Sequence, residues 1–196
     1  MDKTDWLDRL ELELKALQAR TFRAGDPGAL KEILESLCRD CPPEAIARED
    51  RPWLEKLDLD IPVYKPPVFE TAEGLHPGNG QWKPLRDFSV GITGVEYALA
   101  ETGTLILASG RSGGRGLSLA PRHHIALLPE ERIFPSLDEF LDLYPEEESF
   151  LSQGSAVTLI SGASRTADIE LNLVLGAHGP KELSVITLCF PVALPD

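Results

Sequence analysis

The sequence is poor in cysteine, and this excludes several protein classes. Three cysteines occur in 196 residues, at Cys38, Cys41 and Cys189. So few, and an odd number, do not fit the disulfide framework of a secreted domain, and they cannot alone hold an iron–sulfur cluster, which usually takes four thiolates. Cys38 and Cys41 have the CxxC spacing of half a metal knuckle, but no second pair follows. We interpret them as ordinary cysteines near a helix end, with redox or metal use as the alternative.

Long apolar runs and basic clusters are missing as well. No apolar run reaches the roughly 18 residues that span a bilayer, and the N-terminus lacks a basic segment followed by an apolar one. We therefore expect no membrane span, no signal peptide and a cytoplasmic protein. Lys and Arg number 19 against 32 Asp and Glu, which gives a net charge of −13. An acidic chain repels phosphate backbones, so we expect no nucleic-acid partner.

The first 86 residues predict a helical N-terminal extension and a Pro-rich arm. Apolar residues recur at helical spacing over residues 4–20, and again over 29–38. Prolines are frequent from Arg51 to Pro84, where we expect an arm with one short strand at 61–64.

The rest of the chain, residues 87–196, predicts an α/β domain that forms one compact unit with the extension. Short apolar runs alternate with helical patterns, which is typical of a mostly parallel sheet with helices on both faces. The expected strands are 88–93, 104–108, 124–128, 156–160 and 183–188, and the expected helices are 94–100, 136–143 and 166–175. In the helix at 136–143, Ser136 and Glu139 have capping-box spacing.

The most informative segment for chemistry runs from Ile160 to Glu170. We expect a strand that leads through Gly162 and hydroxyl residues into a helix, whose free N–H groups would attract an anion. Ser164 and Thr166 could cap the helix or bind a ligand oxygen, and Arg165 could bind a carboxylate or phosphate. In the alternative reading, Thr166 is only the cap, Asp168 complements the helix dipole and Arg165 pairs with an acid.

Two other segments contain candidate residues. The Gly-rich loop Gly110–Gly116, which includes Arg115, is either a ligand clamp or a surface turn. Glu101 precedes a predicted strand and is either a base or nucleophile or a structural hydrogen-bond acceptor. His123 and His124 are adjacent, so on a strand they point to opposite faces. No two histidines have metal-ligand spacing, and we predict no metal site.

Three motifs occur in order: Gly94–Thr104, with Ala-Glu-Thr-Gly-Thr at its end, then Ser164–Glu170, then Gly176–Pro180. Together they resemble the lactate-utilisation (LUD) domain family, LutC/YkgG type, over residues 87–190. The resemblance implies a fold related to the NagB/RpiA/CoA-transferase group. It also implies a role in the oxidation of L-lactate to pyruvate with iron–sulfur partner proteins, which would carry the clusters.

We hypothesise a small-anion site, for a carboxylate such as lactate or for a phosphate-bearing cofactor, because a predicted helix start, an Arg and hydroxyl residues occur in one short run. Glu101 is the candidate catalytic residue, and we expect Glu101 and Arg165 to line one cleft. The expected ligand-binding residues are Thr102, Gly103, Thr104, Arg115, Ser164, Arg165, Thr166, Asp168 and His178. The alternatives are a free-standing enzyme, similar to CoA-transferases or formyltetrahydrofolate cyclo-ligases, and a ligand-binding module without chemistry. The cofactor, and whether the chain is catalytic, stay open.

Overall fold

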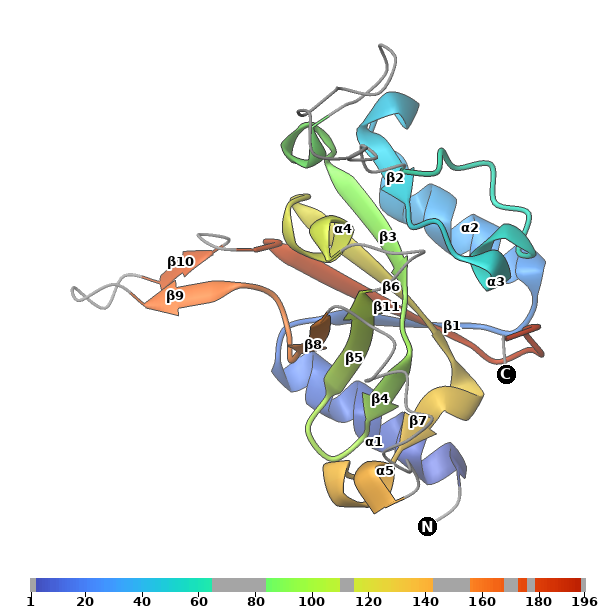
Figure 1. Ribbon diagram of the computed structural model, residues 1–196, viewed down its shortest axis with the longest axis vertical. Helices are drawn as coiled ribbons and strands as arrows, with labels where there is room; N and C mark the ends of the chain where they lie inside the picture. Colours follow the sequence, from blue (N-terminus) through green and yellow to red (C-terminus); the bar gives the residue numbers. More distant parts are fainter. Residues whose placement is uncertain are drawn as a thin grey trace, which may run out of the picture.

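A five-stranded parallel sheet forms the centre of the protein (Figure 1). The computed structural model describes residues 3–64, 84–109, 115–142, 156–167, 173–175 and 179–194. The strand order is β1-β11-β6-β3-β2, and every neighbouring pair is parallel. The strands are β1 (Arg20–Ala24), β2 (Ile46–Arg48), β3 (Val90–Gly94), β6 (His123–Pro129) and β11 (Glu182–Leu188). The predicted α/β class with a mostly parallel sheet is confirmed.

The sheet is covered on both faces, and this explains the composition of its strands. Leu127 and Leu128 are adjacent in β6 and point to opposite faces, yet both side chains are 0% exposed. A strand buried on both faces is mostly apolar, because each polar side chain on either face needs a hydrogen-bond partner in the core. For this reason the apolar runs of β3, β6 and β11 predict strands.

Helices α2 (Pro27–Cys38) and α3 (Pro52–Glu55) cover one face, here called the outer face. The Asp26 side chain caps α2 by accepting the Ala29 N–H at 2.9 Å, and Pro27 occupies the first turn, where its missing N–H costs nothing. Leu30 and Leu34 of α2 pack against the sheet. The helix predicted at 29–38 is confirmed and begins two residues earlier.

Helix α1 (Lys3–Ala16) and a second, four-stranded sheet cover the inner face (Figure 1). The second sheet has the order β7-β4-β5-β8 and is antiparallel except for the β4–β7 pair. Its strands are β4 (Tyr97–Leu99), β5 (Thr104–Ser109), β7 (Ile133–Phe134) and β8 (Ala156–Ile160). The predicted strands at 104–108 and 156–160 are therefore correct, but they belong to this sheet.

Three predicted helices need correction. The helix predicted over 4–20 ends at Ala16, because Arg20 begins β1 and pairs with β11. The segment 94–100, predicted as a helix, contains β4, whose pairing with β5 and β7 overrides the local helical preference.

The helix predicted over 166–175 is also wrong. Strands β9 (Arg165–Ala167) and β10 (Leu173–Leu175) form an antiparallel pair there, which projects from the body of the protein (Figure 1). From Ile169 to Leu175 apolar and polar residues mostly alternate, and this is a strand period rather than a helical one.

Short elements complete the described chain. Helix α5 (Leu137–Asp142) is capped as predicted, since the Ser136 hydroxyl accepts the Glu139 N–H at 3.2 Å. The predicted strand at 61–64 is a single parallel bridge between Val63 and Arg48. The other short helices are η1 (Pro43–Ala45), η2 (Leu85–Asp87), α4 (Gly116–Leu119) and η3 (Glu130–Arg132). None of the helices in the described ranges is both long and apolar enough to cross a membrane.

Candidate functional site

A groove of about 190 Å³ lies between the inner face of the main sheet and strand β8. We call it the hydroxyl groove, because four of its lining side chains carry hydroxyl groups. His124 and Leu183, each the second residue of its strand, place the groove at the amino ends of β6 and β11. Its polar lining residues are Ser118, His124, Thr158, Ser161 and Ser164, and the backbone of Gly162, Gly179 and Pro180 completes it.

His124 is a buried, neutral histidine in the wall of this groove. Its side chain is 1% exposed, and its Nε2 lies 2.8 Å from the Thr93 hydroxyl. Burial, together with the neighbouring His123, lowers the pKa of His124 to about 3. A neutral imidazole offers one donor and one acceptor. His123 points to the outer face, where its Nε2 lies 2.9 Å from the Ser184 hydroxyl, so the prediction of opposite faces is confirmed.

A second, very small cavity continues the groove into the interior. Its volume is about 10 Å³, which is close to the size of one water molecule. Ser118 and Thr158 line both spaces, while Thr93 links the small cavity to His124 through their hydrogen bond. Glu49 and Arg115 also line it. Polar groups therefore form a continuous track between the two sheets.

The track ends at a buried ion cluster at the carboxyl ends of β2 and β3. Arg51 donates from Nε to Glu49 at 2.6 Å, donates to Glu96, and donates from Nη2 to the Ala108 carbonyl at 2.9 Å. Glu49 also accepts the Gly94 N–H at 3.2 Å.

The charges of this cluster depend on each other. Burial raises the pKa of Glu49, and the Arg51 guanidinium opposes that rise. Burial would lower the pKa of Arg51, but the carboxylates of Glu49 and Glu96 outweigh it and keep the pKa above its ordinary value. Removal of one partner would leave an uncompensated charge in the interior.

The structure brings the first two sequence motifs together at the loop 161–164. The Thr104 hydroxyl lies 2.8 Å from the Ser161 hydroxyl and 2.7 Å from that of Thr102. Ser164 donates its N–H to the Pro180 carbonyl at 2.9 Å, which ties the third motif to the same loop. Of the predicted ligand-binding residues, Ser164 lines the hydroxyl groove and Arg115 lines the small cavity.

Other predicted residues lie elsewhere. Glu101 is exposed on the turn between β4 and β5 and lines neither cavity. Gly103 has a φ of +63°, and a Cβ there would lie 2.9 Å from the Glu13 Cβ, so the turn packs closely on α1. This position requires glycine for structural reasons.

The remaining predicted residues are Arg165, Thr166, Asp168 and His178. Arg165 and Thr166 belong to β9, and their side chains are not described; Asp168 and His178 lie outside the described residues. Because Thr166 is in a strand, the helix N-terminus on which the predicted anion site relied does not exist there. Within the described ranges, no three His, Cys, Asp or Glu side chains are grouped to hold a metal ion.

Sequence reasoning missed the ion cluster, as well as Thr93 and Ser118. One available signal was Thr93 itself, a polar residue in the otherwise apolar run Val90–Gly94. Another was the charged run Arg48–Arg51 directly before Pro52 and Trp53. Neither signal shows which charges meet, because that depends on the register of β2 against β3.

Comparison with known proteins identifies the family that has this fold and these motifs. The LUD domain matches residues 83–188, which is more than half of the chain. The chain belongs to the LUD domain family. A crystal structure of a DUF162 family protein from Deinococcus radiodurans has the same fold, with a TM-score of 0.60 and 22% identity over 96% of this chain and 99% of that one.

Curated relatives with the name "Lactate utilization protein C" are similar in sequence. The Halalkalibacterium halodurans protein is 42% identical over 92 residues, 46% of this chain and 40% of the relative. The Bacillus subtilis protein is 35% identical over 131 residues, 66% of this chain and 54% of the relative. The Macrococcus caseolyticus protein is 30% identical over 149 residues, which are 74% of this chain and 61% of the relative. The chain spans about half the length of the curated relatives it matches.

Proposed function

We propose that this chain is a cytoplasmic component of a lactate-utilisation system, in which it supports the oxidation of L-lactate to pyruvate together with iron–sulfur partner proteins. The observation that carries the proposal is its similarity to several proteins named for lactate utilisation, within a family that covers its core. Three cysteines are too few to hold a cluster alone, so the redox centres would belong to the partners.

We further propose that the hydroxyl groove binds the small carboxylate of this system. Hydroxyl and backbone N–H groups can donate to a carboxylate, and a 2-hydroxy acid adds a hydroxyl that can pair with a neutral imidazole. Arg115 lies at the adjoining cavity and can supply a permanent positive charge. These features support an anion site, although it differs from the predicted cleft between Glu101 and Arg165.

A growth experiment tests the role in lactate utilisation. In the organism that encodes the chain, deletion of its gene should prevent growth on L-lactate and leave growth on pyruvate normal, and a plasmid copy should restore growth. Normal growth of the deletion strain on L-lactate would contradict the proposal. So would a failure to grow on either carbon source.

Purification from lactate-grown cells tests the partners. The tagged chain should recover cysteine-rich iron–sulfur proteins, identified by mass spectrometry and by their visible absorption. Cells grown without lactate provide the control. Recovery of the chain without such proteins, even after mild crosslinking, would contradict the partnership.

Ligand-induced stabilisation tests the groove. L-lactate should raise the melting temperature of the purified protein, and Ser161→Ala and Arg115→Ala should each reduce this rise. Arg86→Ala is the matched control, since its side chain is 84% exposed and lines neither cavity. If Arg86→Ala and Arg115→Ala respond alike, the anion is bound elsewhere.

A further inference from the structure

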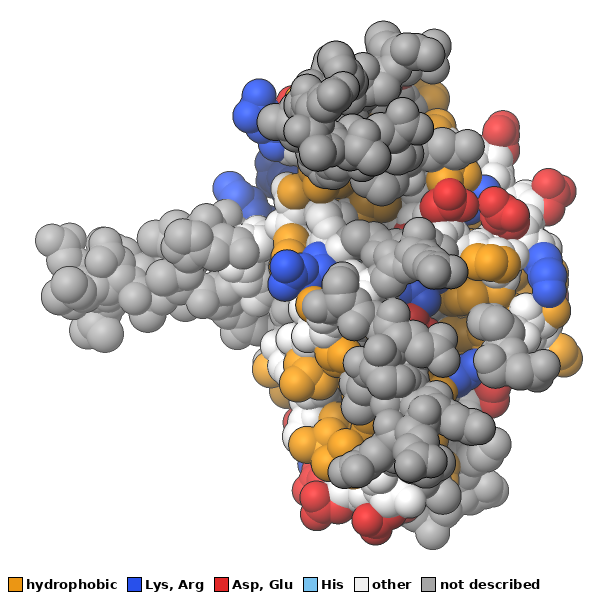
Figure 2. Space-filling model, viewed as in Figure 1, with side chains coloured by type: hydrophobic (Ala, Val, Ile, Leu, Met, Phe, Trp, Pro, Cys, Tyr) orange, Lys and Arg blue, Asp and Glu red, His pale blue; other side chains and the backbone are white. Residues whose placement is uncertain are grey.

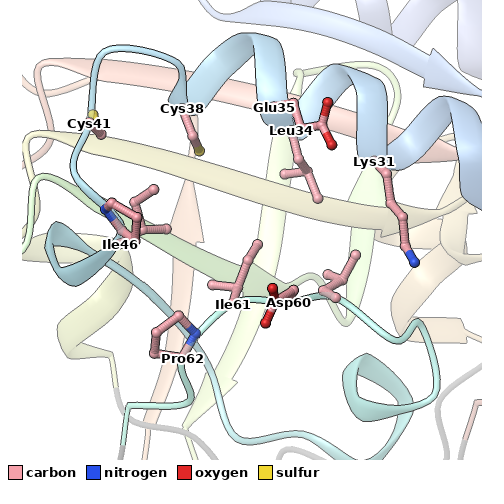
Figure 3. A pocket seen from close by; sticks show the side chains of 11 residues that line it. Lys31, Leu34, Glu35, Cys38, Cys41, Ile46, Asp60, Ile61 and Pro62 are labelled. Carbon is pink, nitrogen blue, oxygen red and sulfur yellow. The ribbon is translucent and has the colours of Figure 1, made fainter.

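A third and larger cavity lies on the outer face of the main sheet. Its volume is about 370 Å³, and it opens between α2 and the extended segment 59–62 (Figure 3). We call it the apolar slot, because apolar residues line most of it. These are Leu34, Pro43, Ile46, Leu59, Ile61 and Pro62.

Both walls of the apolar slot are fixed by the fold. Leu34 is 4% exposed and Ile46 is 9% exposed, so both are held in the core below the slot. On the other side, Arg48 donates its N–H to the Pro62 carbonyl at 2.9 Å, and Ile61 donates to the Leu59 carbonyl at 2.8 Å. A preformed apolar cavity of a few hundred Å³ is typical of small-molecule sites.

The slot is elongated along α2, and its two ends differ in chemistry. Lys31 and Cys38 are seven positions apart in the helix, which corresponds to about 10 Å along its axis. Figure 3 shows Cys38 and Cys41 at one end and Lys31 at the other, with Glu35 and Asp60 between them on opposite sides of the slot. Burial, with a smaller effect from Cys41, raises the pKa of the Cys38 thiol to about 11, so this end presents a neutral thiol. The slot is therefore apolar at the cysteine end and charged at the opposite end.

The lining of the slot contains more acids than bases. Glu35 and Asp60 line it, while Lys31, the cation that also lines it, has the Asp58 carboxylate 3.8 Å from its Nζ. Acidic side chains gather over α2, α3 and the segment 59–62 in Figure 2. Between residues 27 and 62, the exposed acids outnumber the exposed bases. The acids are Glu32, Glu35, Asp40, Glu44, Glu55, Asp58 and Asp60, and the bases are Lys31, Arg39 and Lys56.

We propose that the apolar slot binds a small molecule that has an apolar chain and a protonated amine head. The chain lies along Leu34 and Ile61 towards Cys38, and the amine lies between Glu35 and Asp60. This site is on the opposite face of the sheet from the hydroxyl groove, and it does not depend on the role in lactate utilisation.

Three probes of equal chain length test the proposal, each below its micelle-forming concentration. Isothermal calorimetry should show that octylamine binds about tenfold more tightly than octanoate, with octanol between them, since one favourable charge contact has an effect of this order. Binding of none of the three, or octanoate binding as tightly as octylamine, would overturn the proposal.

Paired variants separate the head from the chain. The double substitution Glu35→Gln and Asp60→Asn should reduce octylamine binding to the level of octanol and leave octanol binding unchanged. The matched control is Glu32→Gln with Glu55→Gln, two exposed acids that do not line the slot. An equal loss of octylamine affinity in the control pair would overturn the assignment of the head.

Filling the slot and probing its thiols give independent readouts. Ile61→Phe should weaken all three probes, and Cys41→Phe provides a second filling variant if the first one unfolds. In the Cys189→Ser protein, octylamine should slow the alkylation of Cys38 and Cys41 by N-ethylmaleimide, measured by mass spectrometry. Binding that persists in both filling variants, or alkylation that octylamine does not slow, would place the amine elsewhere.

Discussion

The two faces of the main sheet are built by the same strands but differ in chemistry. In β6, His123 and Leu127 point to the outer face, while their neighbours His124 and Leu128 point to the inner face. Helices cover the outer face and leave the apolar slot, whereas a small sheet with its turns covers much of the inner face and leaves the hydroxyl groove. The covering layer therefore decides which chemistry a face offers, because turns present hydroxyl and backbone polar groups that a packed helix does not.

The largest expected effect concerns the ion cluster of the inner face. Arg51→Ala should lower the free energy of unfolding by about 3–5 kcal/mol, because it leaves Glu49 and Glu96 without their cation. Urea unfolding at pH 7 measures this loss. A loss below about 1 kcal/mol, typical of an exposed pair, would show that the cluster is solvated.

A combined variant serves as the control for this prediction. Changing Arg51→Met together with Glu49→Gln and Glu96→Gln removes all the charges at similar volume. It should lose less stability than Arg51→Ala alone, since buried ion clusters can be replaced by neutral groups at small cost. If both proteins lose the same amount, the packing of the Arg51 side chain matters more than its charge.

The next prediction compares the two faces directly. Leu127→Ala and Leu128→Ala remove adjacent side chains that are both 0% exposed, one from each face. Each should cost about 2–5 kcal/mol in the free energy of unfolding, from lost burial and the cavity left behind. If Leu128→Ala costs far less than Leu127→Ala, the inner face packs more loosely than the outer one.

The paired histidines predict a pH dependence. Burial lowers the pKa of His123 to about 4 and that of His124 to about 3, from an ordinary 6.5. The unfolded chain therefore binds protons more readily, and stability falls as the pH drops below 6.5. Between pH 6.5 and 5 the loss should approach about 1.4 kcal/mol per pH unit for each histidine. Urea unfolding across this window measures the slope.

Single variants assign that slope to each face. His124→Gln and His123→Gln should each remove roughly half of it, since each removes one of the two titrating groups. A slope that His124→Gln leaves unchanged would mean that His124 is not buried in its neutral form.

The smallest effect expected concerns a glycine of the first motif. Gly103→Ala should cost about 1–2 kcal/mol, because φ is +63° and the new Cβ meets α1. Gly25→Ala is the matched control, since its Cβ would meet nothing within 4 Å. L-lactate should stabilise the Gly103→Ala protein as much as the parent chain. A selective loss of that stabilisation would give the motif a direct role in ligand binding.

In the main sheet, the sequence predicts the three central strands, β3, β6 and β11, and misses the two edge strands, β1 and β2. Runs such as Leu183–Leu188 allow only a buried strand, whereas β1 reads Arg-Thr-Phe-Arg-Ala and lies at an edge, where polar positions are tolerated. Strand β2 has only three residues and forms through its register with β3. Short or edge strands depend on partners that are distant in the chain, so local patterns do not reveal them.

The sequence likewise indicates some residues of the candidate site and not others. The prediction of Ser164 relies on a strand that leads into a helix start; the strand is present and the helix is not, and Ser164 lines the hydroxyl groove. Arg51 and Glu49 are close in the chain, but Glu96 and the Ala108 carbonyl come from distant segments that meet them only in the folded protein. Spacing along the chain cannot show such a meeting. Glu101 is a different case: its position before a strand suggests a catalytic residue, and the structure places its side chain on an exposed turn.

The pairing of β1 with β11 has a consequence for synthesis. Thr21 pairs with Val185, so the first strand of the chain finds its neighbour only after β11 has been made. Closing such a long loop is entropically costly and slows folding. While the ribosome is still working, α1 and α2 lack the sheet that buries their apolar sides. The nascent chain should therefore depend on chaperones until β11 emerges.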